Sequence, residues 1–559
     1  MKKQTFLSGV LILFIAGIIA KILGAVYRIP LTWLLGAEGL GMYQLVYPLF
    51  SLILVLSSTG MPTAISRVTA EYAAKGDFAS ARITLKQSLK LLLSIGTVFA
   101  ILLAASAYFI SSLQGNPNLY ICYLGLVPAV ILVSILSAFR GYFQGCSNMV
   151  PTATSQLIEQ GGKLILGLLC GYFFIGYGVE YGTFGALIGV SASELLATLV
   201  MLIFYQKDRK MRYYSAQNEL HSTVHSTPKV VNHAKKKELQ GATQPNKSLS
   251  QEIGKPPYLE RRKAEEKTLE RTVRKKIISN VIPITLSNAI LPTVLFVESL
   301  FIVALLSHSG LDTLTATTLW GINSGVVGSL INMPIVLTQS VAIAIVPFVA
   351  TLLDTSALQN RYNQAYGLSL TFCTPIIIAF ALLGEPILSI LYQTSLTPAE
   401  LTLATQMLLI MCVSIIFGSL LQTQNNMLQG LGYGSVTARN MAIAAAIQIV
   451  LFVSLSLTNL NIWGCIIASI AFYFIAYLLN YIFIRGKLKL KIFFNTIYPV
   501  IGGGVLLSLY IVNIILLGLN PLLTLILAVA GGGVLYVFGV WVWGGADKLG
   551  LHLKRKKQV

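Results

Sequence analysis

The sequence predicts an all-α, polytopic membrane protein with about fourteen transmembrane helices, and three observations lead to this fold class. Of its 559 residues, 55% are hydrophobic and only 11% are charged, whereas ordinary soluble domains have roughly 45–50% and 25%. Apolar stretches long enough to cross a hydrocarbon core of about 30 Å recur along the whole chain. Segments with the ~10-residue polar and apolar alternation of membrane β-barrels do not occur. These observations exclude a soluble protein.

The first apolar run follows Met1-Lys2-Lys3 and extends to about residue 34, which is too long for the apolar region of a signal peptide. We therefore interpret it as a retained first helix. Further runs follow with short connections, apart from one long polar stretch that ends near residue 276. The fourteen predicted spans are 5–34, 42–65, 88–112, 119–139, 157–178, 183–205, 277–306, 316–349, 367–392, 403–425, 438–458, 462–484, 496–518 and 520–543.

Basic residues are distributed unevenly along the chain, and their distribution predicts the orientation of the helices. The formal net charge is +20, from 40 Lys and Arg against 20 Asp and Glu. With a cytoplasmic N-terminus, 36 of the 40 basic residues fall in segments on the cytoplasmic side and none falls in an outer loop. Because cytoplasmic loops carry an excess of Lys and Arg, this asymmetry predicts cytoplasmic N- and C-termini and an even number of helices.

The two sides of the polar stretch resemble each other, which predicts an internal repeat. Phe143-Gln144-Gly145 before the fifth helix has a counterpart in Leu428-Gln429-Gly430 before the eleventh. Since six helices are an even number, the halves share one orientation and would form two parallel bundles with a cleft between them. The predicted units are an N-terminal six-helix bundle (1–206), a basic cytoplasmic linker (207–276), a C-terminal six-helix bundle (277–485), the extra helices 13 and 14 (486–543) and a basic cytoplasmic tail (544–559).

The linker and the cysteines are not predicted to form a metal site. The linker is rich in Lys, Arg, Gln, Ser and Pro and nearly lacks aromatic residues, so we expect it to be disordered. Its histidines, His221, His225 and His233, could form a metal cluster, but a solvated linker is the simpler interpretation. The six cysteines lie in or beside apolar runs without ligand spacing, which is typical of small core residues. We predict no metal and no cofactor.

Two basic residues fall inside the first predicted helix. Lys21 is near its midpoint, and Arg28 follows seven residues later on the same face, roughly 10 Å further along the axis. A basic side chain at bilayer depth costs at least about 2.5–3.5 kcal/mol, so it usually faces a wet cavity or a partner. Snorkelling or a structural ion pair would explain the two residues without a function. A vertical pair of cations in a cleft would instead suit an anionic headgroup, because Arg binds phosphate oxygens bidentately and Lys acts as a point charge.

Acidic residues inside the spans are candidates for coupling or gating. Glu298 in the seventh helix corresponds by the repeat to a position beside Arg28, so it could pair with Arg28 in one state, or form a fixed salt bridge. Glu159 and Lys163 form an i, i+4 pair that we interpret as structural. Glu194, in the middle of the sixth helix, is either a proton site or paired with a cation of its own half.

The eighth predicted helix is polar without being charged. Asn323 and Gln339 could bind sugar hydroxyls, although a small-xxx-small spacing in the same helix is equally typical of helix packing. No GxxxxGK[ST], HExxH or GxSxG motif occurs in the chain. The sequence therefore does not predict an ATPase or a hydrolase, and we expect that the protein is not an enzyme.

Three segments resemble a known family. KILGAVYRIPLTWLLGAEGLGMYQLVYP at 21–48, GMPTAISRVTAEYAAKGDFASA at 60–81 and FRGYFQG at 139–145 resemble the polysaccharide-biosynthesis and stage V sporulation protein B branch of the multidrug/oligosaccharidyl-lipid/polysaccharide (MOP, MATE-like) exporter superfamily. This branch includes lipid II flippase-like proteins. The resemblance implies a fourteen-helix flippase that moves an undecaprenyl-pyrophosphate-linked saccharide from the inner to the outer leaflet. It also implies a central cavity built from helices 1, 2, 7 and 8, and a groove for the lipid tail at helices 13 and 14.

The resemblance also implies site residues. Lipid II flippases carry a basic pair in helix one, which Lys21 and Arg28 match in type and approximate position. They carry further cavity arginines in helices two and eight, whereas here helix two has only Arg67, at its cytoplasmic end, and helix eight has no charge. Another lipid-linked oligosaccharide is therefore as consistent with the sequence as lipid II. Glu38, at the outer end of helix one, is either a gate residue or an exposed loop carboxylate.

The residues and the resemblance lead to one main hypothesis, a flippase of the bacterial cytoplasmic membrane that serves cell-wall or polysaccharide biogenesis. Its expected partners are a lipid-linked saccharide and membrane lipids, with no nucleic acid, and it would act as a monomer or with the cell-envelope synthesis machinery. A MATE-like antiporter of cations or drugs is one alternative, and it would use acidic residues such as Glu298 and Glu194. The other is a non-transporting scaffold that docks through its linker.

Overall fold

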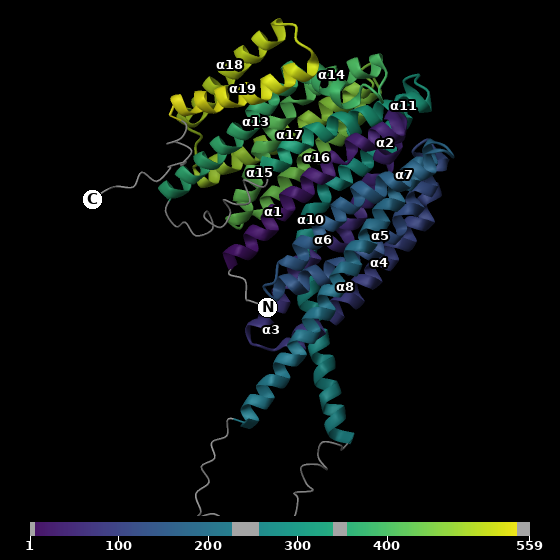
Figure 1. Ribbon diagram of the computed structural model, residues 1–559, viewed down its shortest axis with the longest axis vertical. Coiled ribbons are helices and arrows are strands. Elements are labelled where there is room, and N and C mark those ends of the chain that lie inside the picture. Colours follow the sequence, from purple (N-terminus) through teal and green to yellow (C-terminus); the bar gives the residue numbers. More distant parts are fainter. Residues whose placement is uncertain (1–5, 226–255, 339–354, 545–559) are drawn as a thin grey trace, which may run out of the picture.

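The computed structural model describes residues 6–225, 256–338 and 355–544, and every element within these ranges is helical. Figure 1 shows the helices packed side by side, with α18 and α19 on one flank of the bundle and α4, α5 and α8 on the other. The helices α8 and α10 extend well beyond the rest of the bundle at one end. The predicted all-α class is confirmed.

The helices before the polar linker begin and end at residues that suit helix termini. The Asp77 side chain accepts a hydrogen bond from the Ser80 amide at 2.9 Å and caps the next helix. Hydrogen bonds from the Ser80 side chain and from its amide hold the pKa of Asp77 below its usual value. In chain order the elements are α1 (Phe6–Val26), α2 (Arg28–Leu54), η1 (Val55–Thr59), α3 (Met61–Ala74), α4 (Phe78–Leu113), η2 (Pro117–Leu119), α5 (Tyr120–Gly145), α6 (Val150–Gly162), η3 (Lys163–Gly167), α7 (Leu168–Ile175) and α8 (Val179–His225).

The helices after the linker follow the same rules. Thr397 and Glu400 form a reciprocal capping box at the start of one helix, with Pro398 at its first position. The elements are α10 (Pro256–His308), α11 (Thr313–Trp320), η4 (Gly321–Val327), α13 (Thr355–Tyr392), α14 (Pro398–Met411), α15 (Val413–Gly430), α16 (Gly434–Ser456), α17 (Ile462–Phe483), η5 (Ile484–Leu488), α18 (Phe494–Leu516) and α19 (Pro521–Val542).

The structure contains twelve helical stretches that are long and apolar enough to cross a membrane, or thirteen if α14 and α15, bent by 43°, form one span. The predicted loop between the first two spans, at 35–41, is absent. Helix continues through this region and is broken only at Gly36, which has φ 68°. Glycine adopts this left-handed backbone without steric cost, so a single residue replaces the expected loop. The expected span at 316–349 runs past residue 338, outside the described residues.

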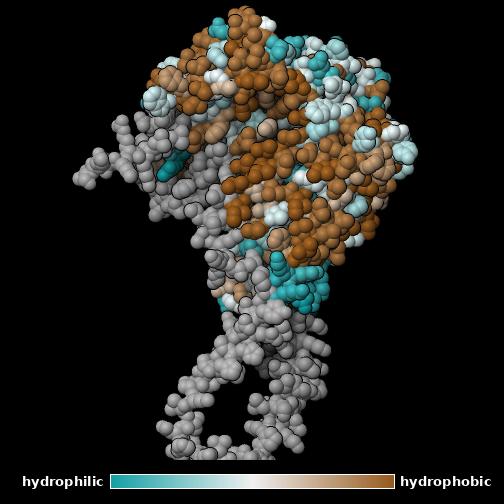
Figure 2. Space-filling view, viewed as in Figure 1, coloured by the Kyte–Doolittle hydropathy of each residue, from teal (hydrophilic) through white to brown (hydrophobic). Residues whose placement is uncertain are grey.

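The surface of the bundle has the character of a protein surrounded by lipid. Figure 2 shows hydrophobic side chains over most of the visible flank, with hydrophilic residues at the end from which α8 and α10 extend and at the opposite end. Phe109, Phe173 and Phe494 are each 70% exposed. Such side chains would be strongly disfavoured in water but are at no disadvantage against hydrocarbon.

One close contact joins helices from the two sides of the linker. The backbone of α2 at Gly41 lies against Thr317 of α11, and the backbone of η4 at Gly321 lies against Ala37 of α2. A Cβ atom at either glycine would overlap a carbonyl oxygen of the facing helix. The helices can approach this closely because each of them has a glycine, without a side chain, at the contact.

We expect Gly41→Val to destabilise the protein by about 1–3 kcal/mol, because the added side chain forces the α2 and α11 backbones apart. The measurement is the apparent unfolding temperature of the purified protein in detergent. Gly533→Ala is the matched control, because a Cβ there would meet no atom within 4 Å. An unchanged unfolding temperature for Gly41→Val would show that the two backbones do not touch.

The last two helices form a pair that packs on α13. Tyr536 of α19 donates a hydrogen bond to the Thr371 carbonyl at 3.0 Å, and Leu507, Ile511 and Tyr536 share a buried cluster with Leu383 of α13. The pair therefore covers one side of α13 and leaves the contact between α2 and α11 untouched.

Candidate functional site

Lys21 and Arg28 line one cavity of about 170 Å³. The helix that carries them does not break between them, because Tyr27 keeps right-handed helical angles and its amide donates to the Leu23 carbonyl at 2.9 Å. The pair therefore stays on one helical face, two turns apart. The cavity lies between this face and residues 329–337, and it is lined by Lys21, Ile22, Gly24, Ala25, Arg28, Ser329, Asn332, Met333, Val336 and Leu337.

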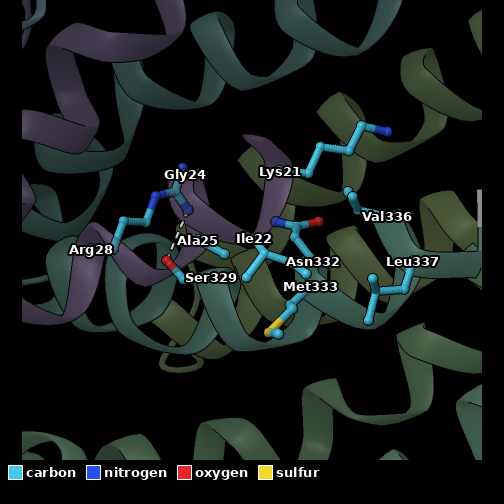
Figure 3. Close-up of a pocket in the computed structure, with 10 residues that line it drawn as sticks. All are labelled: Lys21, Ile22, Gly24, Ala25, Arg28, Ser329, Asn332, Met333, Val336 and Leu337. Carbon is cyan, nitrogen blue, oxygen red and sulfur yellow. Dashed lines mark hydrogen bonds between the residues drawn. The ribbon is translucent and has the colours of Figure 1, made fainter. Parts of the chain in front are cut away.

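The two cations differ in their surroundings. Arg28 is half-buried, and its guanidinium donates a hydrogen bond to the Ser329 hydroxyl at 2.8 Å. Figure 3 shows this contact, with Lys21 on the same helix and its ammonium turned away from Arg28. Lys21 is exposed. The guanidinium retains further N–H donors that could bind an anion in the cavity.

Two neutral polar residues of this cavity were not among the predicted site residues. Ser329 and Asn332 precede Val336 on one face of the eighth predicted helix, at positions i, i+3 and i+7. Ser329 also bonds the Gly325 carbonyl of its own helix. The helical spacing of this polar stripe was the available signal, but the sequence does not show which face of the helix meets Arg28.

The other predicted substrate-binding residues do not line this cavity. Asn323 is buried, and its amide donates to the Cys465 sulfur of α17 at 3.7 Å. Arg67 is exposed on α3. Gln339 lies outside the described residues.

Glu298 is not paired with Arg28 in this conformation. It is buried in α10, and one of its carboxylate oxygens accepts a hydrogen bond from the Gln448 amide of α16 at 2.6 Å. Glu298 does not line the cavity that contains Arg28. Glu38 follows the break at Gly36, is partly buried and lies within a helix, not in an exposed loop.

Four charged residues form a buried network inside the N-terminal helices. Glu159 lies between two cations, with its carboxylate oxygens 2.8 Å from an Arg140 nitrogen and 3.6 Å from the Lys163 ammonium. Lys163 also lies 3.8 Å from Glu194, whose second carboxylate oxygen has no hydrogen-bond partner in the described residues. The formal charges of the four groups cancel.

The network extends the predicted pair of Glu159 and Lys163 in two ways. Lys163 is a neighbour of opposite charge for Glu194. Pairing with a cation of its own half was one of the two alternatives for Glu194, and a proton site was the other. The network also includes Arg140, which directly follows the predicted span 119–139. The Arg140 guanidinium donates hydrogen bonds to the Ser155 hydroxyl and to the Glu159 carboxylate. The helices α5, α6 and α8 are thereby joined by charge inside a low-dielectric region.

Comparison with known proteins shows which proteins this chain is similar to. A model of the polysaccharide biosynthesis protein family matches residues 6–223. Stage V sporulation protein B of Bacillus subtilis (strain 168) is 28% identical over 402 residues, which are 71% of this chain and 68% of that protein. The chain is thus similar to polysaccharide biosynthesis proteins in its N-terminal part and to a sporulation protein over most of its length.

Lipid II flippases are similar to this chain over part of its sequence and, in fold, over nearly its full length. The lipid II flippase MurJ of Bacillus subtilis (strain 168) is 33% identical over 221 residues, 36% of this chain and 40% of that protein. A solved structure of the lipid II flippase MurJ, in an inward closed conformation, aligns with this chain with a TM-score of 0.61 and 15% identity. The alignment covers 97% of this chain and 99% of that protein's chain. The chain is thus a multi-pass protein of the bacterial cytoplasmic membrane.

Proposed function

We propose that this protein is a transporter, and not an enzyme, that moves an undecaprenyl-pyrophosphate-linked saccharide from the inner to the outer leaflet by alternating access. The observation that carries the proposal is the cavity lined by Lys21 and Arg28. A pyrophosphate needs cations in a low-dielectric cleft, and the guanidinium of Arg28 has donors to spare for its oxygens. Ser329 and Asn332 add neutral groups suited to a polar headgroup. The polyprenyl tail can stay in the surrounding lipid.

We further propose fourteen crossings with both termini in the cytoplasm. The stretch Ile15–Ala74 has 60 residues, and as one straight helix it would be about 90 Å long. Since this is about three times the hydrocarbon thickness, we assign it two crossings that meet at Gly36. Together with the bent pair of α14 and α15, this brings the twelve continuous stretches to fourteen crossings.

The proposed mechanism moves two parallel six-helix units, 1–206 and 277–485, against each other. Two corresponding helix ends support this repeat. The helix α5 ends at Gln144-Gly145 before a turn into α6, and α15 ends at Gln429-Gly430 before a turn into α16. The glycine contact between α2 and η4 would close the cavity at its outer end in this conformation. The membrane potential, at about 2.3 kcal/mol per charge per 100 mV, could supply the driving force.

The test is to replace the lipid II flippase of a depleted bacterium by this protein and to measure growth. We expect rescue if lipid II is the saccharide carried. If the well-inserted protein fails to rescue growth and also fails to move a labelled undecaprenyl-pyrophosphate-linked saccharide in liposomes, the flippase proposal is wrong. Movement of the saccharide in liposomes without rescue of growth would exclude lipid II as the substrate but would leave the flippase proposal standing.

A cation or drug antiporter is the second candidate from the same superfamily. Such a protein needs acidic groups where the substrate binds, and none of the ten residues that line the described cavity is acidic. Ethidium efflux that is abolished by Glu298→Gln would favour the antiporter over the flippase. A scaffold role is distinguished by deletion of 210–255, which a flippase should tolerate and a scaffold should not.

A further inference from the structure

A second and larger hollow opens on the flank of the bundle, away from the cavity described above. It has a volume of about 850 Å³ and lies between α4, α5 and α8. It shares no lining residue with the cavity of Lys21 and Arg28. In Figure 1 these three helices form the flank opposite α18 and α19. We call this hollow the flank groove.

Three basic residues of α4 line the flank groove. Arg82, Lys86 and Lys90 follow one another at i, i+4 and i+8, so they form a stripe about 12 Å long on one face of the helix. All three side chains are exposed. Lys86 and Lys90 form no ion pair within the described residues, and the Arg82 side chain bonds only the Phe78 carbonyl, at 3.4 Å. The groove therefore carries three positive charges that no acidic side chain of the described chain neutralises.

The walls of the flank groove below this stripe are apolar. Leu93, Leu195 and Leu199 are each nearly half exposed, at 45%, 47% and 48%. Phe139 and Tyr205 pack against each other with ring centroids 5.5 Å apart and line the same hollow. Leucines exposed on a membrane helix face acyl chains, and aromatic rings are typical of the membrane interface. The groove thus combines a cationic rim with an apolar floor.

One polar group inside the groove also lacks a partner. Thr198 is only 4% exposed, it lines the groove, and its hydroxyl has no hydrogen-bond partner within the described residues. A buried hydroxyl without a partner is costly, and most such groups in proteins bind another group or an ordered molecule. A ligand whose polar part reaches past the rim would satisfy it.

We propose that the flank groove binds a two-chain phospholipid with an anionic headgroup from the cytoplasmic leaflet. The phosphate lies on Arg82, Lys86 and Lys90, the glycerol ester region reaches Thr198, and an acyl chain fills the hollow beside Leu199. A membrane phospholipid fits better than the transported substrate, because the groove faces the lipid and is separate from the inter-helix cavity. The site does not depend on the transport function proposed above.

Native mass spectrometry of the purified full-length protein tests the site, with phosphatidylglycerol and phosphatidylcholine as the two probes. We expect phosphatidylglycerol to bind at least tenfold more tightly than phosphatidylcholine. Removing the three charges by Arg82→Gln, Lys86→Gln and Lys90→Gln should weaken phosphatidylglycerol binding about fivefold for each charge. The matched control removes three exposed charges from the same end of the bundle but outside the groove, by Lys207→Gln, Arg209→Gln and Lys210→Gln, and should leave binding unchanged.

Leu199→Trp provides a second variant that keeps every charge and fills the apolar floor. Because Leu199 is half exposed toward lipid, the larger ring should not disturb the helix packing. We expect it to weaken phosphatidylglycerol binding at least tenfold.

Two results would overturn the proposal. Equal loss of binding in the two triple variants would mean that phosphatidylglycerol is attracted only by the general positive charge of this end. Displacement of phosphatidylglycerol by an equal concentration of undecaprenyl phosphate would assign the groove to a polyprenyl lipid.

Discussion

Arg28→Ala is expected to abolish growth rescue in the flippase-depleted bacterium while the amount of inserted protein stays unchanged. Arg28 is held in the cavity by a 2.8 Å hydrogen bond to Ser329. A hydrogen bond to a charged group contributes about 1.5–3 kcal/mol, and loss of two such bonds to a pyrophosphate would weaken binding by at least 100-fold. Lys21→Ala should reduce rescue in the same direction.

Two variants separate this role from a general effect of charge. Lys487→Ala removes one exposed cation from the η5 segment, far in sequence from the cavity, and should rescue growth like the unchanged protein. Arg28→Lys keeps the charge but loses the bidentate geometry, so it should rescue only in part. Full rescue by Arg28→Ala would contradict a pyrophosphate site on the first helix.

Glu159→Gln is expected to destabilise the protein by about 3–5 kcal/mol, because it leaves Arg140 and Lys163 buried with Glu194 as their one acidic partner. The side chains of Arg140 and Glu159 are only 13% and 15% exposed, so water cannot replace the lost charge. The apparent unfolding temperature in detergent and the yield of folded protein should both fall.

An exposed ion pair supplies the control for this effect. Lys276 and Glu71 lie 2.6 Å apart, but their side chains are 45% and 46% exposed. Glu71→Gln should therefore cost no more than about 1 kcal/mol. The double variant Arg140→Gln/Glu159→Gln should recover part of the stability lost in Glu159→Gln, because it removes the unpaired cation as well. Equal effects of Glu159→Gln and Glu71→Gln would mean that the inner network is solvated.

The expected spans agree with the observed helices over most of the chain, because lipid permits only structures whose backbone groups are bonded internally. The main difference is the loop expected at 35–41. Three glycines and Glu38 give this segment the composition of a loop, but the structure breaks the helix only at Gly36. The bent pair of α14 and α15 was likewise expected as one uninterrupted run at 403–425.

The sequence predicted the charged residues of the first helix that line the cavity, but not the residues of the facing helix. The seven-residue spacing of Lys21 and Arg28 puts them on one face of any helix, and both line the cavity. Their neutral neighbours Ser329 and Asn332 were missed, and Asn323 was chosen in their place. Asn323 lies on a different face, against Cys465, and periodicity does not reveal which face of a polar helix meets which neighbour.

The sequence by itself determined the all-α membrane class and the position of two cations within the first helix. These follow from the length and polarity of segments, which the bilayer selects directly. Only the tertiary structure decided which groups meet: Arg28 with Ser329, 301 residues away, Glu298 with Gln448, 150 residues away, and Arg140 with Glu159 on a neighbouring helix. Such contacts depend on the rotation and close approach of packed helices, which residue spacing along one helix does not encode.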